Sequence, residues 1–349
     1  MSIHIEQSPF IQACFGQETP YTPVWIMRQA GRYQQEYRDI RAKHSFLELC
    51  KSPDLVSEVT CLAVNMLNVD AAIIFADILL ILESLGFDLD FLKGHGPTIH
   101  NPFRLESSLD QIVEPNIPES YAYLQQAVAL TRKNLPPHTP LIGFAGSPFT
   151  VASYAIEGGS SKNFEHTKKL MRSDPDKMIA LLNHLTEATI DYVKLQLDAG
   201  ANAIQIFDSW IGVLSAKEAK TFAIPFAKQI FDFIKMYSAN VPSIYFGVNT
   251  AHLIESMKDA GSDVMGIDFR TPLNQMKQDL NLKAVQGNLD PITLLCDKSV
   301  IEHELDHLLS SINNPNQGYI FNLGHGILPN TPVEHAQFLV AQVHQKTKR

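Results

Sequence analysis

Two arginines follow directly on a short apolar run near the start of the chain. The run Val24–Met27 ends at Arg28, and Arg32 stands four residues further on. A guanidinium stays charged at every working pH, and its planar fork matches carboxylates and phosphates. The segment therefore predicts a site for an anionic ligand. For these two residues taken alone, solvated arginines at a strand end are the simpler interpretation.

A carboxylate stands at the end of the next apolar run. Asp77 follows the run 71–76, which contains neither Lys nor Arg. An Asp at this position most often caps the following helix. It could instead offer a buried negative charge to a cationic or NH-rich ligand.

Further polar side chains that could take part in chemistry lie later in the chain. His325 stands between two glycines, which would let a ligand approach the backbone closely, so we favour a functional role for it. Ser147 and Ser209 are more simply turn residues, because the GxSxG elbow of hydrolases is absent. Tyr154 is more simply a packing residue. Asp268 is as well explained by a hydrogen bond at the rim of a fold.

Eight short runs of apolar and β-branched residues recur along the chain, and most are separated by segments with helical spacing. Continuously apolar runs are typical of parallel strands buried on both faces. The alternation predicts an α/β fold, and eight units favour a single (β/α)₈ TIM barrel. A doubly wound sheet is the alternative, but no GxGxxG turn follows the first run. The predicted strands are Val24–Met27, Ala71–Phe75, Leu141–Ala145, Ala203–Phe207, Ser243–Phe246, Val264–Phe269, Lys283–Gln286 and Tyr319–Leu323.

The intervening segments also make specific predictions. The clearest helix covers Asp174–Ala199, with Ser173 or Asp174 as its N-cap. Pro225 should kink or divide a later helix. The connection 33–69 is predicted to hold two helices, and the turn-rich part 86–102 a hairpin or an irregular lid. A closing helix is expected near the C-terminus.

In a TIM barrel the chemistry lies at the C-terminal ends of the strands. Every predicted strand end in this chain is polar or glycine-rich, so these residues should face one cavity. They are Arg28, Asp77, Ser147, Ser209, Asn249, Asp268, Asn288 and His325.

Composition narrows the functional classes. The 349 residues include 28 basic and 37 acidic side chains, which give a formal net charge of -9. Because there is also no long basic run, neither nucleic acid nor an anionic membrane is an expected partner. We expect one catalytic domain over residues 1–349, with 1–20 as an N-terminal extension, no signal peptide and no membrane span. Four scattered cysteines without ligand spacing predict reduced thiols, a cytoplasmic location and no metal site.

Six motifs, taken together and in order, resemble the uroporphyrinogen decarboxylase family. The resemblance extends from about residue 20 to the C-terminal helix. It implies a TIM barrel, a homodimer and a reaction without metal or organic cofactor, in which the four acetate side chains of uroporphyrinogen III become methyl groups to give coproporphyrinogen III in haem biosynthesis. The motifs are Pro23–Tyr33, Ala71–Ile78, Ile142–Phe149, Glu157–Gly159, Gln286–Pro291 and Asn322–Gly326.

The resemblance also implies roles for individual residues. Three arginines would bind substrate carboxylates, Asp77 would accept the central pyrrole NH groups, and two residues would form apolar walls. Trp210 and the segment Phe246–Asn249 depart from the pattern, because some members have His at the first position and a lysine in the second segment. The implied substrate-binding residues are Arg28, Arg32, Arg41, Ile73, Phe75, Asp77, Tyr154, Ser209 and His325, and the implied catalytic residues are Asp77, Arg28 and His325.

The expected chemistry fits these residue types. Loss of CO₂ leaves an electron pair that needs an acceptor, and a protonated pyrrole ring provides one without a cofactor. Asp77 would stabilise the ring cation. Arg28 is a candidate proton donor by position, but a guanidinium is a poor acid at neutral pH, so His325, water or a substrate carboxylate are alternatives.

Two other classes of protein are alternatives. Corrinoid-linked methyltransferases share the barrel of this superfamily, but they use zinc held by His and Cys, and the segment around His325 has no HxC. A porphyrin-binding protein without turnover is a second alternative, against which the polar strand ends argue.

Overall fold

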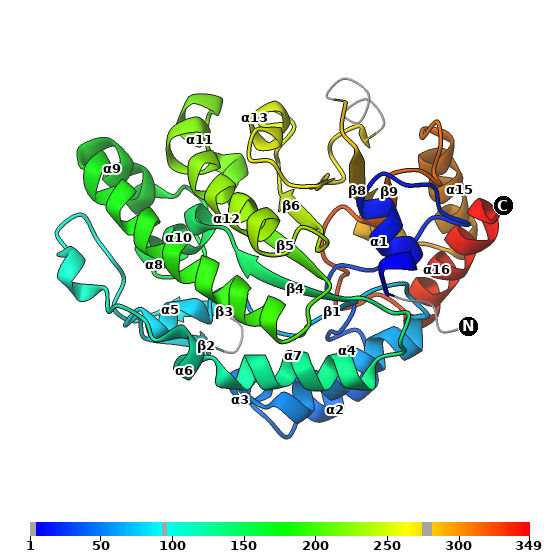
Figure 1. Cartoon of the computed structure of the whole chain (residues 1–349), viewed down its shortest axis with the longest axis horizontal. Helices are drawn as coiled ribbons and strands as arrows, with labels where there is room; N and C mark the ends of the chain where they lie inside the picture. Colours follow the sequence, from blue (N-terminus) through cyan, green and yellow to red (C-terminus); the bar gives the residue numbers. More distant parts are fainter. Residues whose placement is uncertain (1–4, 93–95, 274–280) are drawn as a thin grey trace.

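The computed structural model describes residues 5–92, 96–273 and 281–349, and its centre is a curled parallel sheet (Figure 1). Seven of its strands follow one another around the sheet in the order β1-β4-β5-β6-β7-β8-β9, all pairs parallel. This confirms the α/β class. The strands are β1 (Ala72–Ile73), β4 (Leu141–Gly146), β5 (Ala203–Asp208), β6 (Ser243–Gly247), β7 (Val264–Gly266), β8 (Ala284–Leu289) and β9 (Tyr319–Leu323).

The first predicted strand, Val24–Met27, forms an isolated parallel bridge instead of a ladder. Val24 pairs with Phe321 of β9, and its carbonyl accepts the amide of Asp70 just before β1, so the segment closes the gap between the two edge strands. Side-chain oxygens accept hydrogen bonds from three amides of the segment. Asp70 Oδ2 accepts from Val24 at 2.7 Å, Gln29 Oε1 from Ile26 at 3.1 Å, and Asn322 Oδ1 from Met27 at 2.9 Å. The prediction of a regular strand was wrong for this reason, although the segment occupies the expected place in the barrel.

The sheet is surrounded by helices that lie between successive strands (Figure 1). The longest, α10, is capped by the Asp174 side chain, which accepts the Lys177 amide at 3.0 Å, as predicted. Pro225 stands in the first turn of α12 and separates it from α11. The helices after β4 are α8 (Pro148–Glu157), α9 (Glu165–Ser173), α10 (Pro175–Asp198), α11 (Ala216–Phe222), α12 (Ile224–Tyr237), α13 (Ile254–Lys258), α15 (Lys298–Ser310) and α16 (Val333–Thr347), with short 3₁₀ turns at Ile211–Val213 and Pro291–Leu295.

The two long connections are built differently from simple crossovers. The first holds three helices where two were predicted, and the second contains an antiparallel hairpin that confirms the hairpin prediction for 86–102. The elements are α2 (Gln35–Arg41), α3 (Phe46–Lys51), α4 (Pro53–Leu67), α5 (Ile81–Ser84), β2 (Leu89–Leu92), β3 (Gly96–Ile99), a 3₁₀ turn at Leu109–Gln111, α6 (Ile117–Ser120) and α7 (Ala122–Asn134).

The N-terminal segment is packed into the barrel. After a 3₁₀ turn at Ile5–Gln7, helix α1 (Pro9–Cys14) places Phe10 and Cys14 against the first residues of the strands, including Ile142 and Ile320. Phe10 and Cys14 are fully buried. The helix therefore covers the N-terminal end of the barrel and leaves the opposite end for chemistry. None of the helices in the described ranges has the length and apolar character needed to cross a membrane.

Candidate active site

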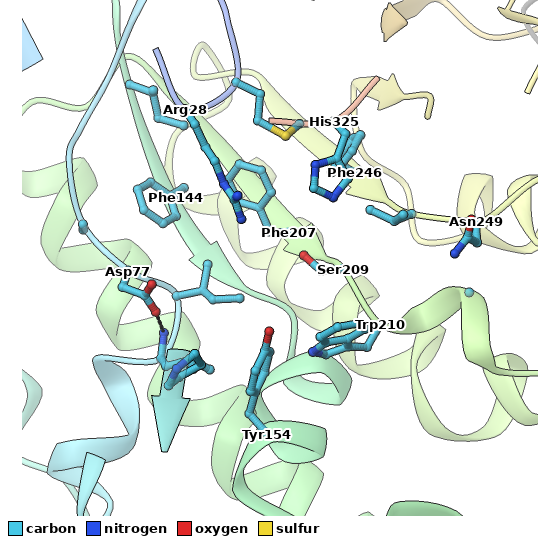
Figure 2. Close-up of a pocket in the computed structure, with 18 of the residues that line it drawn as sticks. Arg28, Asp77, Phe144, Tyr154, Phe207, Ser209, Trp210, Phe246, Asn249 and His325 are labelled. Atoms are coloured by element: carbon cyan, nitrogen blue, oxygen red, sulfur yellow. Dashed lines mark hydrogen bonds between the residues drawn. The ribbon is translucent and has the colours of Figure 1, made fainter. Parts of the chain in front are cut away.

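A cavity of about 620 Å³ opens at the C-terminal ends of the strands (Figure 2). Five of the eight predicted strand-end residues meet there, whereas Ser147, Asp268 and Asn288 do not line the cavity. The predicted residues that line it are Arg28, Ile73, Phe75, Asp77, Tyr154, Ser209 and His325, and Asn249 lines it as well.

Arg28 enters the cavity because its backbone is left-handed. Its φ is +65°, a conformation that L-residues seldom adopt, and it turns the chain sharply after Met27. The side chain then runs past Gly326, where an added Cβ would lie 2.5 Å from Arg28 Cδ. Figure 2 shows the guanidinium directed towards the centre of the cavity.

Asp77 both stabilises a turn and lines the cavity. Its Oδ1 accepts the Leu79 amide at 2.9 Å within the turn that precedes helix α5. The N-cap of that helix is Leu80, so the prediction that Asp77 caps the following helix was wrong. Burial raises the pKa of this carboxyl, while the Leu79 N–H and the charge of Arg28 act in the opposite direction. An ionised Asp77 is thus poorly solvated, and a cation or NH group brought into the cavity would stabilise it.

His325 is held in one tautomer. Its Nδ1 accepts the amide of Gly326 at 2.8 Å, which leaves the proton of the neutral ring on Nε2. Burial lowers the pKa of His325, and the charges of Arg28 and Arg270 lower it further. The ring is therefore neutral at neutral pH and can donate a hydrogen bond from Nε2.

Tyr154 reaches the cavity from helix α8, whose start is tied to the neighbouring strands by Asp208. The buried Asp208 accepts from Thr150 Oγ1 at 2.6 Å and from Tyr245 OH at 2.8 Å, and Thr150 Oγ1 in turn accepts the Trp210 amide at 3.1 Å. Asp208 therefore points away from the cavity and positions the helix. In Figure 2 the Tyr154 hydroxyl and the Arg28 guanidinium point towards one another from opposite sides.

An aromatic wall completes the cavity, and sequence reasoning missed it. Phe207 packs edge-on against Phe144, with ring centroids 5.5 Å apart, and against Phe246 at 6.0 Å. All three lie near the C-terminal ends of β4, β5 and β6. The sequence feature that could have revealed this wall is an aromatic residue close to the polar end of each of these strands. In a single strand, such a residue cannot be distinguished from an ordinary core residue.

Trp210 lines the cavity beside Tyr154. Its ring centroid lies 5.5 Å from that of Tyr154 and 5.1 Å from that of Phe164, which is buried. The position where some relatives were expected to carry His is thus filled by an indole that joins helix α8 to the loop following it.

Arg32 and Arg41 do not line the cavity. Arg32 is exposed, and its carbonyl accepts from Arg38 Nη1 at 2.8 Å. The Arg41 guanidinium donates to the carbonyl of His44 and lies 5.7 Å from the centroid of the Phe46 ring. The structure therefore brings together Arg28, Asp77 and His325 but leaves these two arginines outside.

Asp268 is a structural residue of the rim. Its carboxylate accepts the amides of Asn249 and Arg270 and the hydroxyl of Thr271. Within the described ranges, no group of three or more His, Cys, Asp or Glu side chains is arranged to hold a metal ion.

The parallel barrel and its cavity at the C-terminal strand ends define the class of TIM-barrel enzymes. Within that class, the chain belongs to the uroporphyrinogen decarboxylase (URO-D) family, whose profile matches residues 6–346. The uroporphyrinogen decarboxylase of Carboxydothermus hydrogenoformans is 46% identical over 337 residues, 96% of this chain and 95% of that protein. A uroporphyrinogen decarboxylase of Thermus thermophilus is 43% identical over 96% of this chain and 97% of its own.

Solved structures show the same fold at lower identity. A methyltransferase from Methanosarcina mazei superposes with a TM-score of 0.83 at 19% identity, covering 99% of each chain. A B12-independent methionine synthase from Shewanella sp. W3-18-1 gives a TM-score of 0.56 at 11% identity, with 95% of this chain and 98% of the other covered. At these identities the likeness concerns the fold alone.

Proposed function

We propose that the chain decarboxylates the four acetate side chains of uroporphyrinogen III to give coproporphyrinogen III, without a cofactor. The observation that carries the proposal is the pairing, in one cavity, of a poorly solvated carboxylate, Asp77, with the cationic Arg28. A tetrapyrrole with NH groups at its centre and carboxylates at its edge needs both signs of charge in this arrangement.

Asp77 accepts the pyrrole NH groups in this proposal. Its Oδ1 is engaged by Leu79, and the carboxylate faces the cavity with capacity for further donors. Protonation of a pyrrole carbon makes the ring a cation, and a fixed carboxylate in a partly dry cavity stabilises that cation more than water would. The aromatic wall of Phe144, Phe207 and Phe246 supplies an apolar surface for the macrocycle.

The reaction on each arm balances without an external oxidant or reductant. A proton adds to the α-carbon next to the ring carbon that carries the acetate arm, which places positive charge on that arm-bearing carbon. The bond between the methylene of the arm and its carboxylate then breaks, and CO₂ leaves. The electron pair of that bond neutralises the ring cation and forms an exocyclic methylene. A second proton then adds to the exocyclic methylene and gives the methyl group, and loss of the first proton from the α-carbon restores the aromatic pyrrole.

Arg28 and His325 orient the acetate carboxylate. The guanidinium binds it as a charged fork, and the neutral imidazole donates from Nε2. Since the lowered pKa keeps His325 unprotonated and Arg28 is a very weak acid, we assign the proton to water or to a carboxylic acid of the substrate that these two side chains hold. Tyr154 and Ser209 contact the substrate from the other walls, and Arg32 and Arg41 attract its carboxylates outside the cavity.

We further propose that the chain acts as a homodimer in the cytoplasm. The family resemblance supports the dimer, and four unpaired cysteines in the described structure fit a reducing compartment. Sedimentation equilibrium would test the dimer.

The decisive experiment is anaerobic incubation of the purified protein with uroporphyrinogen III. We expect release of CO₂ and accumulation of the tetracarboxylate product, separated by chromatography after oxidation. Binding of the substrate without CO₂ release would contradict the proposal in favour of a porphyrin-binding protein.

A further inference from the structure

We infer that Lys162 binds a propionate carboxylate of the substrate, on the side of the cavity opposite Arg28. The inference rests on the proposed function, because it requires a substrate that carries carboxylates around its edge. Lys162 was not among the residues predicted from the sequence or implied by the family motifs. It lines the cavity from the 158–164 loop, which follows helix α8.

The loop that carries Lys162 is firmly anchored on one side by the β2–β3 hairpin. Gly159 forms an antiparallel bridge with Thr98, and the carbonyl of Gly158 accepts the amide of Ile99 at 3.0 Å. A Cβ on Gly159 would lie 2.8 Å from the Pro97 carbonyl oxygen, so the two backbones are in close contact. The hairpin therefore fixes the start of the loop at the mouth of the cavity.

The other end of the loop is anchored in the aromatic cluster. Phe164 is 3% exposed and packs against Trp210, and its amide donates to Ser161 Oγ at 2.9 Å. Trp210 lies across the cavity from Arg28 in Figure 2. The backbone of Lys162 is thus held between two fixed points on the far side of the cavity.

The side chain of Lys162, by contrast, has no hydrogen-bond or ion-pair partner among the residues that the structure describes. It is exposed, and in the described part of the chain no carboxylate pairs with it. The acidic residues nearest in sequence are engaged elsewhere: Glu157 Oε1 accepts from the amide and the hydroxyl of Thr167, both at 2.8 Å, and Glu165 accepts from Asn163. An ordered loop that presents an uncompensated ammonium group to the cavity suits an anionic ligand.

The chemistry of the reaction identifies which carboxylate it binds. Each pyrrole ring of the substrate carries one acetate and one propionate arm, and the acetates are lost one after another. A contact that is present in all four turnovers must be made to an arm that the reaction leaves intact. The flexible stem of lysine can follow a propionate as the macrocycle turns to present each acetate in turn.

The test uses Lys162→Gln, with Lys169→Gln as a matched control. Lys169 is an exposed lysine on the adjoining helix α9 and does not line the cavity. For Lys162→Gln we expect the KM for uroporphyrinogen and the inhibition constant of the product coproporphyrinogen to rise about three- to tenfold, with kcat within twofold. Lys162→Arg should restore both values, and Lys169→Gln should change neither.

The remaining outcomes overturn the inference. Wild-type values of both constants in Lys162→Gln would show that Lys162 binds no carboxylate. A raised KM with an unchanged inhibition constant for coproporphyrinogen would assign the contact to an acetate. Turnover of uroporphyrinogen by the wild-type protein is measured first. If the wild-type protein shows no turnover, the proposed function fails, and this result is distinct from a failure of the inference about Lys162. Melting temperatures of all variants verify the fold.

Discussion

The side chain of Arg28 lies directly over the α-carbon of Gly326. A Cβ added at Gly326 would stand 2.5 Å from Cδ and 2.9 Å from Nε of Arg28, both too close for carbon or nitrogen contacts. The glycine after His325 thus makes room for the arginine, in addition to donating its amide to His325 Nδ1. One residue without a side chain sets the positions of two side chains of the candidate active site.

Replacement of Gly326 by alanine should therefore displace Arg28. We expect kcat/KM for uroporphyrinogen to fall about tenfold or more, because a catalytic group moved by about 1 Å can cost as much as 10² in rate. A double-mutant cycle with Arg28→Ala provides the control. If Gly326 acts through Arg28, the double variant should be no worse than Arg28→Ala alone, whereas additive losses would contradict this explanation.

Replacement of Asp77 by asparagine separates the charge of Asp77 from its hydrogen bond within the turn. Asparagine keeps an acceptor for the Leu79 amide, so the turn should persist and the melting temperature should remain close to that of the wild type. Loss of the negative charge should reduce kcat by about 10²–10³, as for other preorganised electrostatic partners. Near-normal turnover would remove Asp77 from the mechanism.

The pKa of His325 should respond to Arg270. Burial and the charges of Arg28 and Arg270 lower this pKa below its ordinary value of 6.5. Arg270 lies outside the cavity lining, so Arg270→Gln should raise the pKa of His325 with little change in shape. An NMR titration of the ring proton would measure it, with His325→Gln to assign the signal. An unchanged pKa would leave burial and the charge of Arg28 as the causes.

The lowered pKa of His325 also makes the stability of the fold depend on pH. The unfolded chain binds a proton at His325 near pH 6.5, whereas the folded chain does so only at lower pH. Between these two values the unfolded state holds more protons, so the contribution of His325 to the free energy of unfolding grows as pH rises and is lost as pH falls. His325→Gln should flatten the stability profile in that window, which chemical denaturation at several pH values would reveal.

The sequence was sufficient to predict the barrel and most of the cavity, because strand ends are local signals. A polar residue after a continuously apolar run marks where a strand leaves the core, and parallel strands bring all such ends to one edge. Asp77, Ser209 and His325 were found in this way. Asp208 and Asp268 carry the same local signal, and only the folded contacts show that they bind neighbouring backbone and hydroxyl groups instead of facing the cavity.

What could not be predicted depends on which partners a segment finds in the folded chain, some of them distant in the sequence and some only a few residues away. The Val24–Met27 segment has the composition of a strand, but Asp70, Gln29 and Asn322 take its amides. The position of Arg41 is decided by the His44 carbonyl and the Phe46 ring, which no strand pattern indicates. The aromatic wall was missed because a phenylalanine near a strand end has the same composition whether it faces the core or a cavity.

Trp210 connects the cavity to the loop that carries Lys162. Its indole packs against both Tyr154 and Phe164, and aromatic pairs of this kind contribute about 0.5–1.5 kcal/mol each. Trp210→Ala removes both contacts, whereas Trp210→Phe keeps a ring in place. The loop should therefore open more often in the first variant than in the second.

Limited proteolysis with trypsin would measure this opening at Lys162. Opening of the loop breaks the Trp210–Phe164 pair, so loss of about 0.5–1.5 kcal/mol should raise the open fraction about 2- to 13-fold. Cleavage after Lys162 should accelerate in proportion when closing is faster than cutting. Trp210→Phe should be cut at nearly the wild-type rate. Cleavage after Lys169 on helix α9 serves as an internal reference for global unfolding. If both sites were cut faster in equal measure in Trp210→Ala, Trp210 would stabilise the whole fold and not the loop.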